Sequence, residues 1–277
     1  MNWSKLRTPQ YWLLAIATAL ATLQLTAVLQ ADDAELLSMS ALFWLTISSL
    51  LWDKRKQLNL NSGRVASLLG AGLIAFVLLR TLSPDGYNVR ILPFISGCGL
   101  ALLASGIKQV YQYWKELVVL SLFGVVSVLS LILRAIDLPT ITAQFSTFVL
   151  WAAGFRVYRQ GVLIVLPTGR VEVWGACSGI ENIIQMFSVA VLFLLLISLP
   201  RWQQFLCLIV AVLLGFIVNA GRVALLAVLV ASAHTEAFEY WHGGSGSLFF
   251  SMMAVLLFGI FCWLVFFRDP PSELEGQ

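Results

Sequence analysis

Long apolar stretches separated by short polar segments run along almost the whole chain. Eight of them approach the length that a helix needs to cross the hydrocarbon of a bilayer, about 20 residues. They cover approximately residues 11–29, 36–52, 65–82, 91–107, 117–134, 180–199, 205–232 and 247–267. The pattern therefore predicts an all-α polytopic membrane protein with about eight transmembrane helices.

One part of the chain departs from the helical pattern. The segments Gly161–Leu166 and Val171–Trp174 flank Pro167–Arg170, an order that predicts strand, turn and strand. Pro167 and Gly169 suit the second and fourth positions of a type I turn. We expect a short extracytoplasmic β-hairpin that lies against the helix ends, because a two-stranded ribbon is marginal alone. It either makes a tight connection or offers a strand edge to an extended peptide.

Composition agrees with a membrane setting, since 60% of the 277 residues are hydrophobic and only 11% are charged. The first stretch is longer than the apolar region of a signal peptide, and we interpret it as an uncleaved span. Basic residues gather in loops on one side, which predicts that this side and both termini are cytoplasmic. They are Lys5, Arg7, Lys54, Arg55, Lys56, Arg64, Lys108, Lys115, Arg201 and Arg268.

The opposite, extracytoplasmic side then receives the whole segment Ile136–Gly179 and the stretch His234–Gly246. Three arginines in the first of these segments weaken the charge bias. The net charge of +3 therefore reflects topology, and it predicts no nucleic-acid binding. Both segments are therefore expected outside the cytoplasm.

We treat the chain as a single integral membrane domain with two parts that meet at about residue 135. Residues 1–135 hold five predicted spans and no grouping of acid, base and nucleophile residues, so we expect them to form a scaffold or a substrate-docking wall. Residues 136–277 hold every chemically suggestive motif. Two histidines with few nearby carboxylates predict no metal site, and no phosphate-binding loop or other cofactor motif is present.

Cys177 is the most informative of the four cysteines. Cys98, Cys207 and Cys262 fall inside predicted spans, where cysteine usually serves as a small apolar side chain. Cys177, followed by Ser178 and Gly179, lies at the predicted start of a helix. Unpaired N–H groups and a partial positive charge at that end favour the thiolate, the nucleophilic form.

Other polar residues are expected at the same outer face. Arg222 follows Asn219 by three residues on one helix face, and it is either functional or snorkels to the headgroups. Both histidines, His234 and His242, lie in the last outer connection, where each is a candidate proton carrier. Glu181 lies in the first turn of its helix, where it complements the dipole or pairs with Arg222.

In these motifs the chain resembles the exosortase/archaeosortase family of membrane-embedded cysteine transpeptidases. The resemblance lies in Ala176-Cys-Ser-Gly179, then Asn219-Ala-Gly-Arg222, then His242-Gly-Gly-Ser-Gly-Ser-Leu-Phe-Phe250, in that order. The residues Ile180-Glu-Asn182 are most similar to the cyanobacterial branch, the cyanoexosortases.

The resemblance implies that Cys177 attacks a peptide carbonyl, that His242 is the acid/base, and that Arg222 steadies developing charge or orients the thiolate. His234 stays the competing base. The implied partners are exported proteins with a C-terminal sorting tail: a Pro-Glu-Pro type motif, a transmembrane helix and a basic cluster. Cleavage would leave a thioester, and water or a surface acceptor, a lipid or a polysaccharide, would resolve it.

Two other functions compete with this one. A transporter or flippase would use Arg222 to bind an anionic lipid or polymer precursor, and Cys177 would only pack. A scaffold subunit of an export complex would need neither residue. The cysteine motif at a helix start favours the peptidase, because a transporter has no evident need for it.

Overall fold

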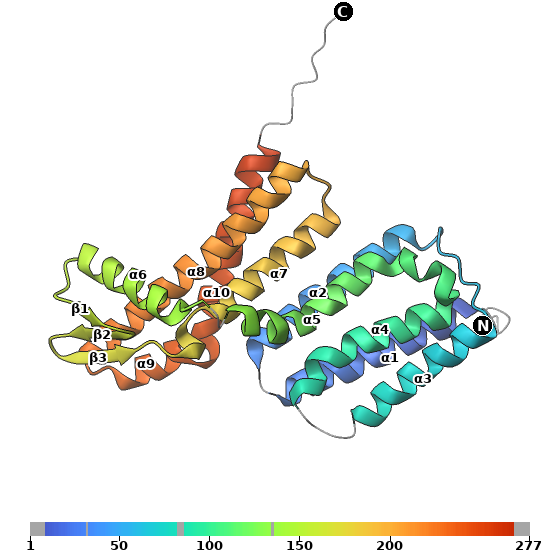
Figure 1. The fold of residues 1–277 in the computed structure, drawn as a ribbon, viewed down its shortest axis with the longest axis horizontal. Helices are drawn as coiled ribbons and strands as arrows, with labels where there is room; N and C mark the ends of the chain where they lie inside the picture. The colour runs from blue at the N-terminus through green and yellow to red at the C-terminus, as the bar shows by residue number, and fades with distance from the viewer. Residues whose placement is uncertain (1–8, 32, 82–85, 134–135, 269–277) are drawn as a thin grey trace, which may run out of the picture. The chain divides into compact units, whose positions relative to one another are not determined.

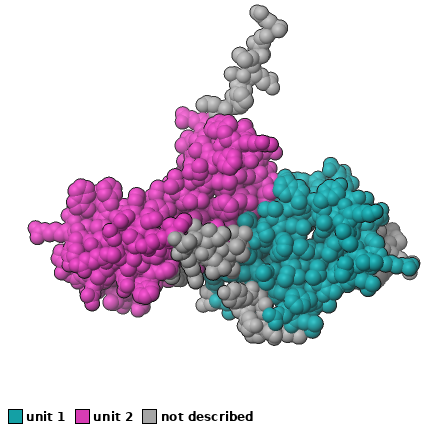
Figure 2. All heavy atoms as spheres, viewed as in Figure 1, with its two compact units in different colours: residues 1–127 teal, residues 128–277 magenta. Residues whose placement is uncertain are grey.

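The computed structural model describes residues 9–31, 33–81, 86–133 and 136–268. Lys5 and Arg7, which were predicted to be cytoplasmic, lie outside the described residues. The chain is mostly helical and divides into two compact units, residues 1–127 and 128–277 (Figure 2). Every residue singled out for chemistry in the sequence belongs to the second unit.

The first unit is a bundle of long helices (Figure 1). It contains α1 (Pro9–Gln30), α2 (Ala34–Lys54), α3 (Arg64–Arg80), α4 (Gly86–Gln109), the 3₁₀ turn η2 (Val110–Tyr113) and the first part of α5 (Trp114–Leu133). The Asp33 side chain accepts the Leu36 N–H at 2.9 Å and so caps the start of α2. The helices α3 and α1 both pack on α4.

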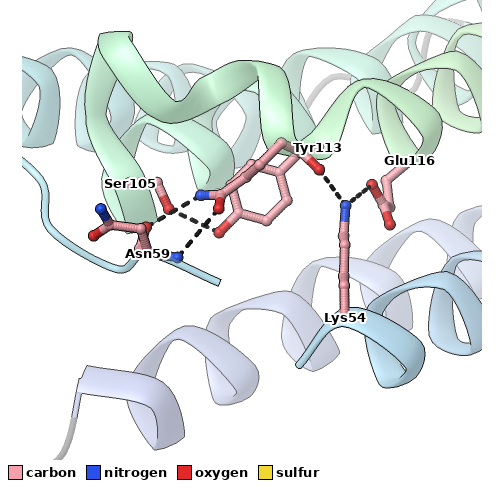
Figure 3. A network of polar contacts seen from close by, with 6 residues as sticks. Lys54, Asn59, Ser105, Tyr113 and Glu116 are labelled. Carbon is pink, nitrogen blue, oxygen red and sulfur yellow. Dashed lines mark hydrogen bonds and ion pairs between the residues drawn. The ribbon is translucent and has the colours of Figure 1, made fainter. Parts of the chain in front are cut away.

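A polar network ties the end of α2 to the junction of α4 and α5 (Figure 3). Lys54 pairs with Glu116 at 2.6 Å and also donates to the carbonyl of Gln112. The Gln112 side chain exchanges two hydrogen bonds with the Asn59 backbone, at 3.1 and 3.2 Å. Because Glu116 is only 4% exposed, its carboxylate depends on Lys54 to compensate its charge inside a largely apolar bundle.

The second unit is built around one long helix. Its elements are α6 (Leu138–Ala152), the strands β1 (Tyr158–Gln160), β2 (Leu163–Leu166) and β3 (Gly169–Glu172), the 3₁₀ turn η3 (Gly175–Cys177), α7 (Ile180–Leu196), α8 (Arg201–Ala231), α9 (Thr235–His242), α10 (Gly244–Cys262) and the π-helical turn η4 (Trp263–Phe267). The helix α8 contacts α6, α7, α9, α10 and the sheet, so it positions the rest of the unit.

Two apolar clusters cover different parts of α8. One joins α7, α8 and α10 through residues such as Met186, Ala211 and Phe258. Gly215 lets α7 and α8 approach closely, because a Cβ there would lie 2.7 Å from the Asn182 carbonyl oxygen. The other cluster joins α6, α8 and the sheet, and it includes the partly buried Cys177.

The sheet is antiparallel, with strand order β1-β2-β3. Leu166 pairs with Gly169, which leaves Pro167 at the second and Gly169 at the fourth position of the turn, as the sequence predicted. The sheet lies against the end of α8, where the Thr168 hydroxyl donates to the Ala231 carbonyl at 2.6 Å. The predicted hairpin is therefore present as β2 and β3, and β1 adds a third strand that the sequence did not predict.

Five segments of the described residues are long and apolar enough to cross a membrane: Gln10–Gln30, Ala34–Lys54, Arg90–Gly124, Arg201–Ala231 and Gly246–Phe267. A membrane protein with several spanning helices is thus supported, whereas eight spans are not shown. The helices α3 and α7 have 17 residues each, slightly short of a full span. The fourth and fifth predicted stretches correspond to α4 and α5. The segment Arg90–Gly124 runs from α4 through η2 into α5, and its helical geometry breaks at Gly106, with φ of 71°.

Two connections contain helices that the sequence did not predict. The segment from residue 136 to the sheet holds α6, which begins where the Asp137 side chain accepts the Thr140 N–H at 3.3 Å. The connection between the last two spans holds α9, whose eight residues include four aromatic rings, counting that of His242. Both helices contribute contacts to the site described next.

Candidate active site

Cys177 is the last residue of the 3₁₀ turn η3, and Ser178 and Gly179 separate it from the start of α7 at Ile180. Its backbone is held from two helices. The Asn219 side chain on α8 donates to the Cys177 carbonyl at 3.0 Å, and the Thr142 hydroxyl on α6 donates to the Ser178 carbonyl at 2.8 Å. Since Thr142 and Asn219 are almost fully buried, these bonds fix the turn that carries the thiol.

Gly179 gives the turn its shape. Its φ of 87° lies in the left-handed region, which residues with a Cβ rarely adopt. A Cβ at this position would lie 2.7 Å from the Asn219 amide nitrogen. Gly179 thus allows both the sharp entry into α7 and the close approach of Asn219. Ser178, which is buried, stabilises the same turn by donating to the Gly175 carbonyl at 2.5 Å.

Asn219 is itself held by a second amide that the sequence analysis did not assign to the site. The Asn182 side chain on α7 donates to the Asn219 side-chain oxygen at 3.2 Å. This acceptor contact fixes which way the Asn219 amide points, so its NH₂ group faces the Cys177 carbonyl. A buried asparagine in an otherwise apolar helix was the available signal for this contact.

His242 meets the thiol of Cys177. The distance from His242 Nε2 to Cys177 Sγ is 3.6 Å, within hydrogen-bonding reach of a sulfur atom. The two residues come from elements 65 positions apart in the chain. A cysteine and a histidine in contact are the minimum for acyl-thioester chemistry, and such contacts are often longer without substrate than with it.

His234, the competing base, lies elsewhere. It immediately precedes α9 and is exposed, and its N–H donates to the Leu229 carbonyl at 3.0 Å. His242 is the last residue of the same helix, so about 12 Å of helix axis separates the two positions. Of the two histidines, the structure brings His242 to Cys177.

Arg222 is 8% exposed and holds the end of α9. Its Nε donates to the Trp241 carbonyl at 3.2 Å, and its Nη2 donates to the His242 carbonyl. Both carbonyls belong to the last turn of α9, where a helix lacks internal donors and where a cation complements the dipole. The arginine therefore fixes the backbone of the histidine that meets Cys177.

Burial raises the pKa of the Cys177 thiol, and the positive charge of Arg222 partly opposes this effect. Burial dominates, so the pKa of Cys177 lies above its usual range. The expectation that the helix terminus would favour the thiolate is wrong for the free protein. Cys177 lies three positions before Ile180, the first residue of α7, and is partly buried between the sheet, α6 and α8. Its activation needs a base.

Two further residues complete the surroundings of the site. Phe238 stacks on the His242 ring, with centroids 5.1 Å apart and an interplanar angle of 10°. The sequence analysis did not name Phe238, although its spacing of four residues from His242 would place both on one face of a helix. Glu181 is exposed in the first turn of α7. Among the described residues, no group of three potential ligands could hold a metal ion.

The chain matches the model of the transmembrane exosortase family over residues 31–259. No curated protein and no solved structure matches the chain. The match spans most of the chain and includes Cys177, Asn219, Arg222 and His242. The chain therefore belongs to the transmembrane exosortase family.

Proposed function

We propose that this transmembrane exosortase is a cysteine protease or transpeptidase that cleaves the C-terminal sorting tail of exported proteins through a thioester on Cys177. The observation that carries the proposal is the 3.6 Å contact between Cys177 Sγ and His242 Nε2. It joins a nucleophile and a base in a unit where buried side chains hold the backbone of each.

The reaction begins with proton transfer. His242 Nε2 takes the proton of the Cys177 thiol, and the thiolate attacks the carbonyl carbon of the scissile peptide bond. The tetrahedral intermediate collapses as the imidazolium returns the proton to the leaving nitrogen. The carbon–nitrogen bond breaks, the tail departs as an amine, and the rest of the substrate stays on Cys177 as a thioester. Water or a nucleophilic surface acceptor then attacks the thioester carbonyl and releases the thiol.

Arg222 contributes charge as well as position. Its guanidinium lowers the pKa of Cys177 and thus favours the thiolate and the anionic intermediate. Two of its five N–H donors go to the Trp241 and His242 carbonyls, which ties the arginine to the backbone of the residue that meets Cys177 and favours the peptidase over the transporter alternative.

The proposed topology has eight spans, cytoplasmic termini and an active site at the outer face of a bacterial inner membrane. In α8, Arg222 lies 21 residues beyond the first residue, Arg201, or about 32 Å along the axis. This length slightly exceeds the hydrocarbon thickness of about 30 Å. A helix that begins at the cytoplasmic boundary thus carries Arg222 to the opposite one.

The proposed substrates carry a Pro-Glu-Pro type motif, a transmembrane helix and a basic cluster. A substrate helix beside the helices of the enzyme delivers its motif to the outer face, and the membrane supplies a high effective concentration. The residues Ile180-Glu-Asn182 support placing the chain in the cyanobacterial branch.

The test is co-expression with a tailed substrate, with tail removal followed on gels. We expect processing by the unchanged protein and its loss in Cys177→Ala and His242→Ala at equal protein level. Mass spectrometry of the trapped species should show the substrate attached to Cys177. Processing that survives Cys177→Ala would overturn the proposal in favour of the transporter.

A further inference from the structure

The imidazole ring of His242 has two partners within the part of the chain that the structure describes. One is the Cys177 thiol, 3.6 Å from Nε2, and the other is the ring of Phe238, stacked nearly parallel. The contacts of Arg222 reach only the backbone carbonyl of His242. They fix where the residue lies and leave the rotation of its ring to other contacts.

A base that serves a cysteine must present one nitrogen to the sulfur. In many such sites a third side chain accepts the other ring N–H and so sets the orientation of the imidazole. Arg222 cannot act in this way, because a guanidinium has donors and no acceptor. Orientation of the ring must therefore come from a contact of a different kind.

Phe238 supplies that contact from one helical turn away. Positions i and i+4 of α9 lie on one face, so the Phe238 ring covers the face of the His242 ring. Rotating the imidazole out of this plane about its terminal side-chain bond would break the 10° parallel stack. When the proton moves from Cys177 to His242, the new cation also lies over the negative face of an aromatic ring.

We propose that Phe238 is a positioning residue that fixes the plane of the His242 imidazole so that Nε2 faces Cys177. The inference rests on the proposed function, because it assigns Phe238 to the same cysteine–histidine pair. Phe238 acts through His242 and needs no contact with substrate. This role predicts that its removal has no effect once His242 is absent.

The experiment measures the alkylation rate of Cys177 by iodoacetamide at neutral pH in the full-length purified protein. Cys98, Cys207 and Cys262 are first replaced by alanine, so that Cys177 is the one cysteine left to be alkylated. The Phe238→Ala and Phe238→Leu variants should react about two- to tenfold more slowly, the factor expected from the loss of one aromatic pair. Phe238→Tyr retains the ring and should react within twofold of the parent protein.

A double-mutant cycle separates positioning from general damage to the fold. Phe238→Ala added to His242→Ala should change the alkylation rate by less than twofold. An equal loss in both backgrounds, or an unchanged rate in Phe238→Ala alone, would overturn the inference. If His242→Ala itself leaves the rate unchanged, the cysteine–histidine pair and with it the proposed function fail. The two failures are therefore distinguishable.

Discussion

Replacing Arg222 by methionine, a side chain of similar length without charge, removes the contacts that hold the last turn of α9. Two hydrogen bonds from a charged donor are lost, each worth about 1.5–3 kcal/mol. Because the freed carbonyls of Trp241 and His242 can bond to water at a partly exposed helix end, we take the lower limit of about 3 kcal/mol in total. At about 1.4 kcal/mol for each factor of ten, the productive arrangement becomes roughly 100-fold less populated.

The assay compares the rate of tail removal for the parent protein, Arg222→Met and Arg222→Lys. Lysine keeps the charge near Cys177 and loses the planar fork that meets two carbonyls at once. We therefore expect Arg222→Lys to retain the pH profile of Cys177 alkylation and to lose much of the processing rate. Limited proteolysis at α9 should become faster in both variants. Unchanged processing and proteolysis in Arg222→Met would refute the reasoning.

Three further predictions concern separate features. Gly179→Ala places a Cβ on a residue with left-handed backbone geometry and against the Asn219 side chain, so the substitution should cost about 1–2 kcal/mol and lower both the Tm and the processing rate. An unchanged Tm would contradict this prediction. Lys54→Met leaves the Glu116 carboxylate buried without its cation and should cost about 3 kcal/mol in thermal unfolding, and Glu116→Gln added to it should restore most of the loss. Because burial raises the pKa of Cys177, its alkylation rate should still rise above pH ~8.5, the usual value for a thiol; a rate already constant at neutral pH would contradict the raised pKa.

The membrane class of the fold was predictable because apolar runs of sufficient length carry it directly. The number of spans was harder to predict, since hydropathy does not report where a helix ends inside an apolar run. The helices α3 and α7 end after 17 residues, although the predicted stretches 65–82 and 180–199 continue for two or three more, mostly apolar, residues. The strand β1 was missed for a related reason. Its three residues, Tyr158–Gln160, are too few to show an alternation, and their pairing with β2 defines them.

The chemistry-bearing residues of the site were predictable from motif order, whereas their roles were not. The sequence named Cys177, Arg222 and His242 without showing that the arginine reaches backbone carbonyls. Such contacts depend on α9, a two-turn helix in what appeared to be a loop. The pKa direction of Cys177 also needed the structure, because burial depends on residues from α6, the sheet and α8.

The spacing of Asn219 and Arg222 suggests a last prediction about how the site is set. These residues lie three apart on one face of α8, and each donates to the backbone of one reacting residue: Asn219 to Cys177, Arg222 to His242. The rigid helix between them thus sets the distance between thiol and imidazole. Once either bond is lost, the distance is no longer fixed, so the second loss adds little.

We therefore expect non-additive effects of Asn219→Ala and Arg222→Met. Loss of the neutral bond from Asn219 to the Cys177 carbonyl in Asn219→Ala should slow processing by roughly fivefold, from about 1 kcal/mol. For independent contacts the double variant would show the product of the two single losses, about 500-fold if Arg222→Met costs about 100-fold. If α8 instead sets one shared distance between the thiol and the imidazole, the double variant should lose about as much activity as Arg222→Met alone. The test compares the processing rates of the parent protein, the two single variants and the double variant at matched expression. Full additivity of the two losses would show that α8 holds Cys177 and His242 independently.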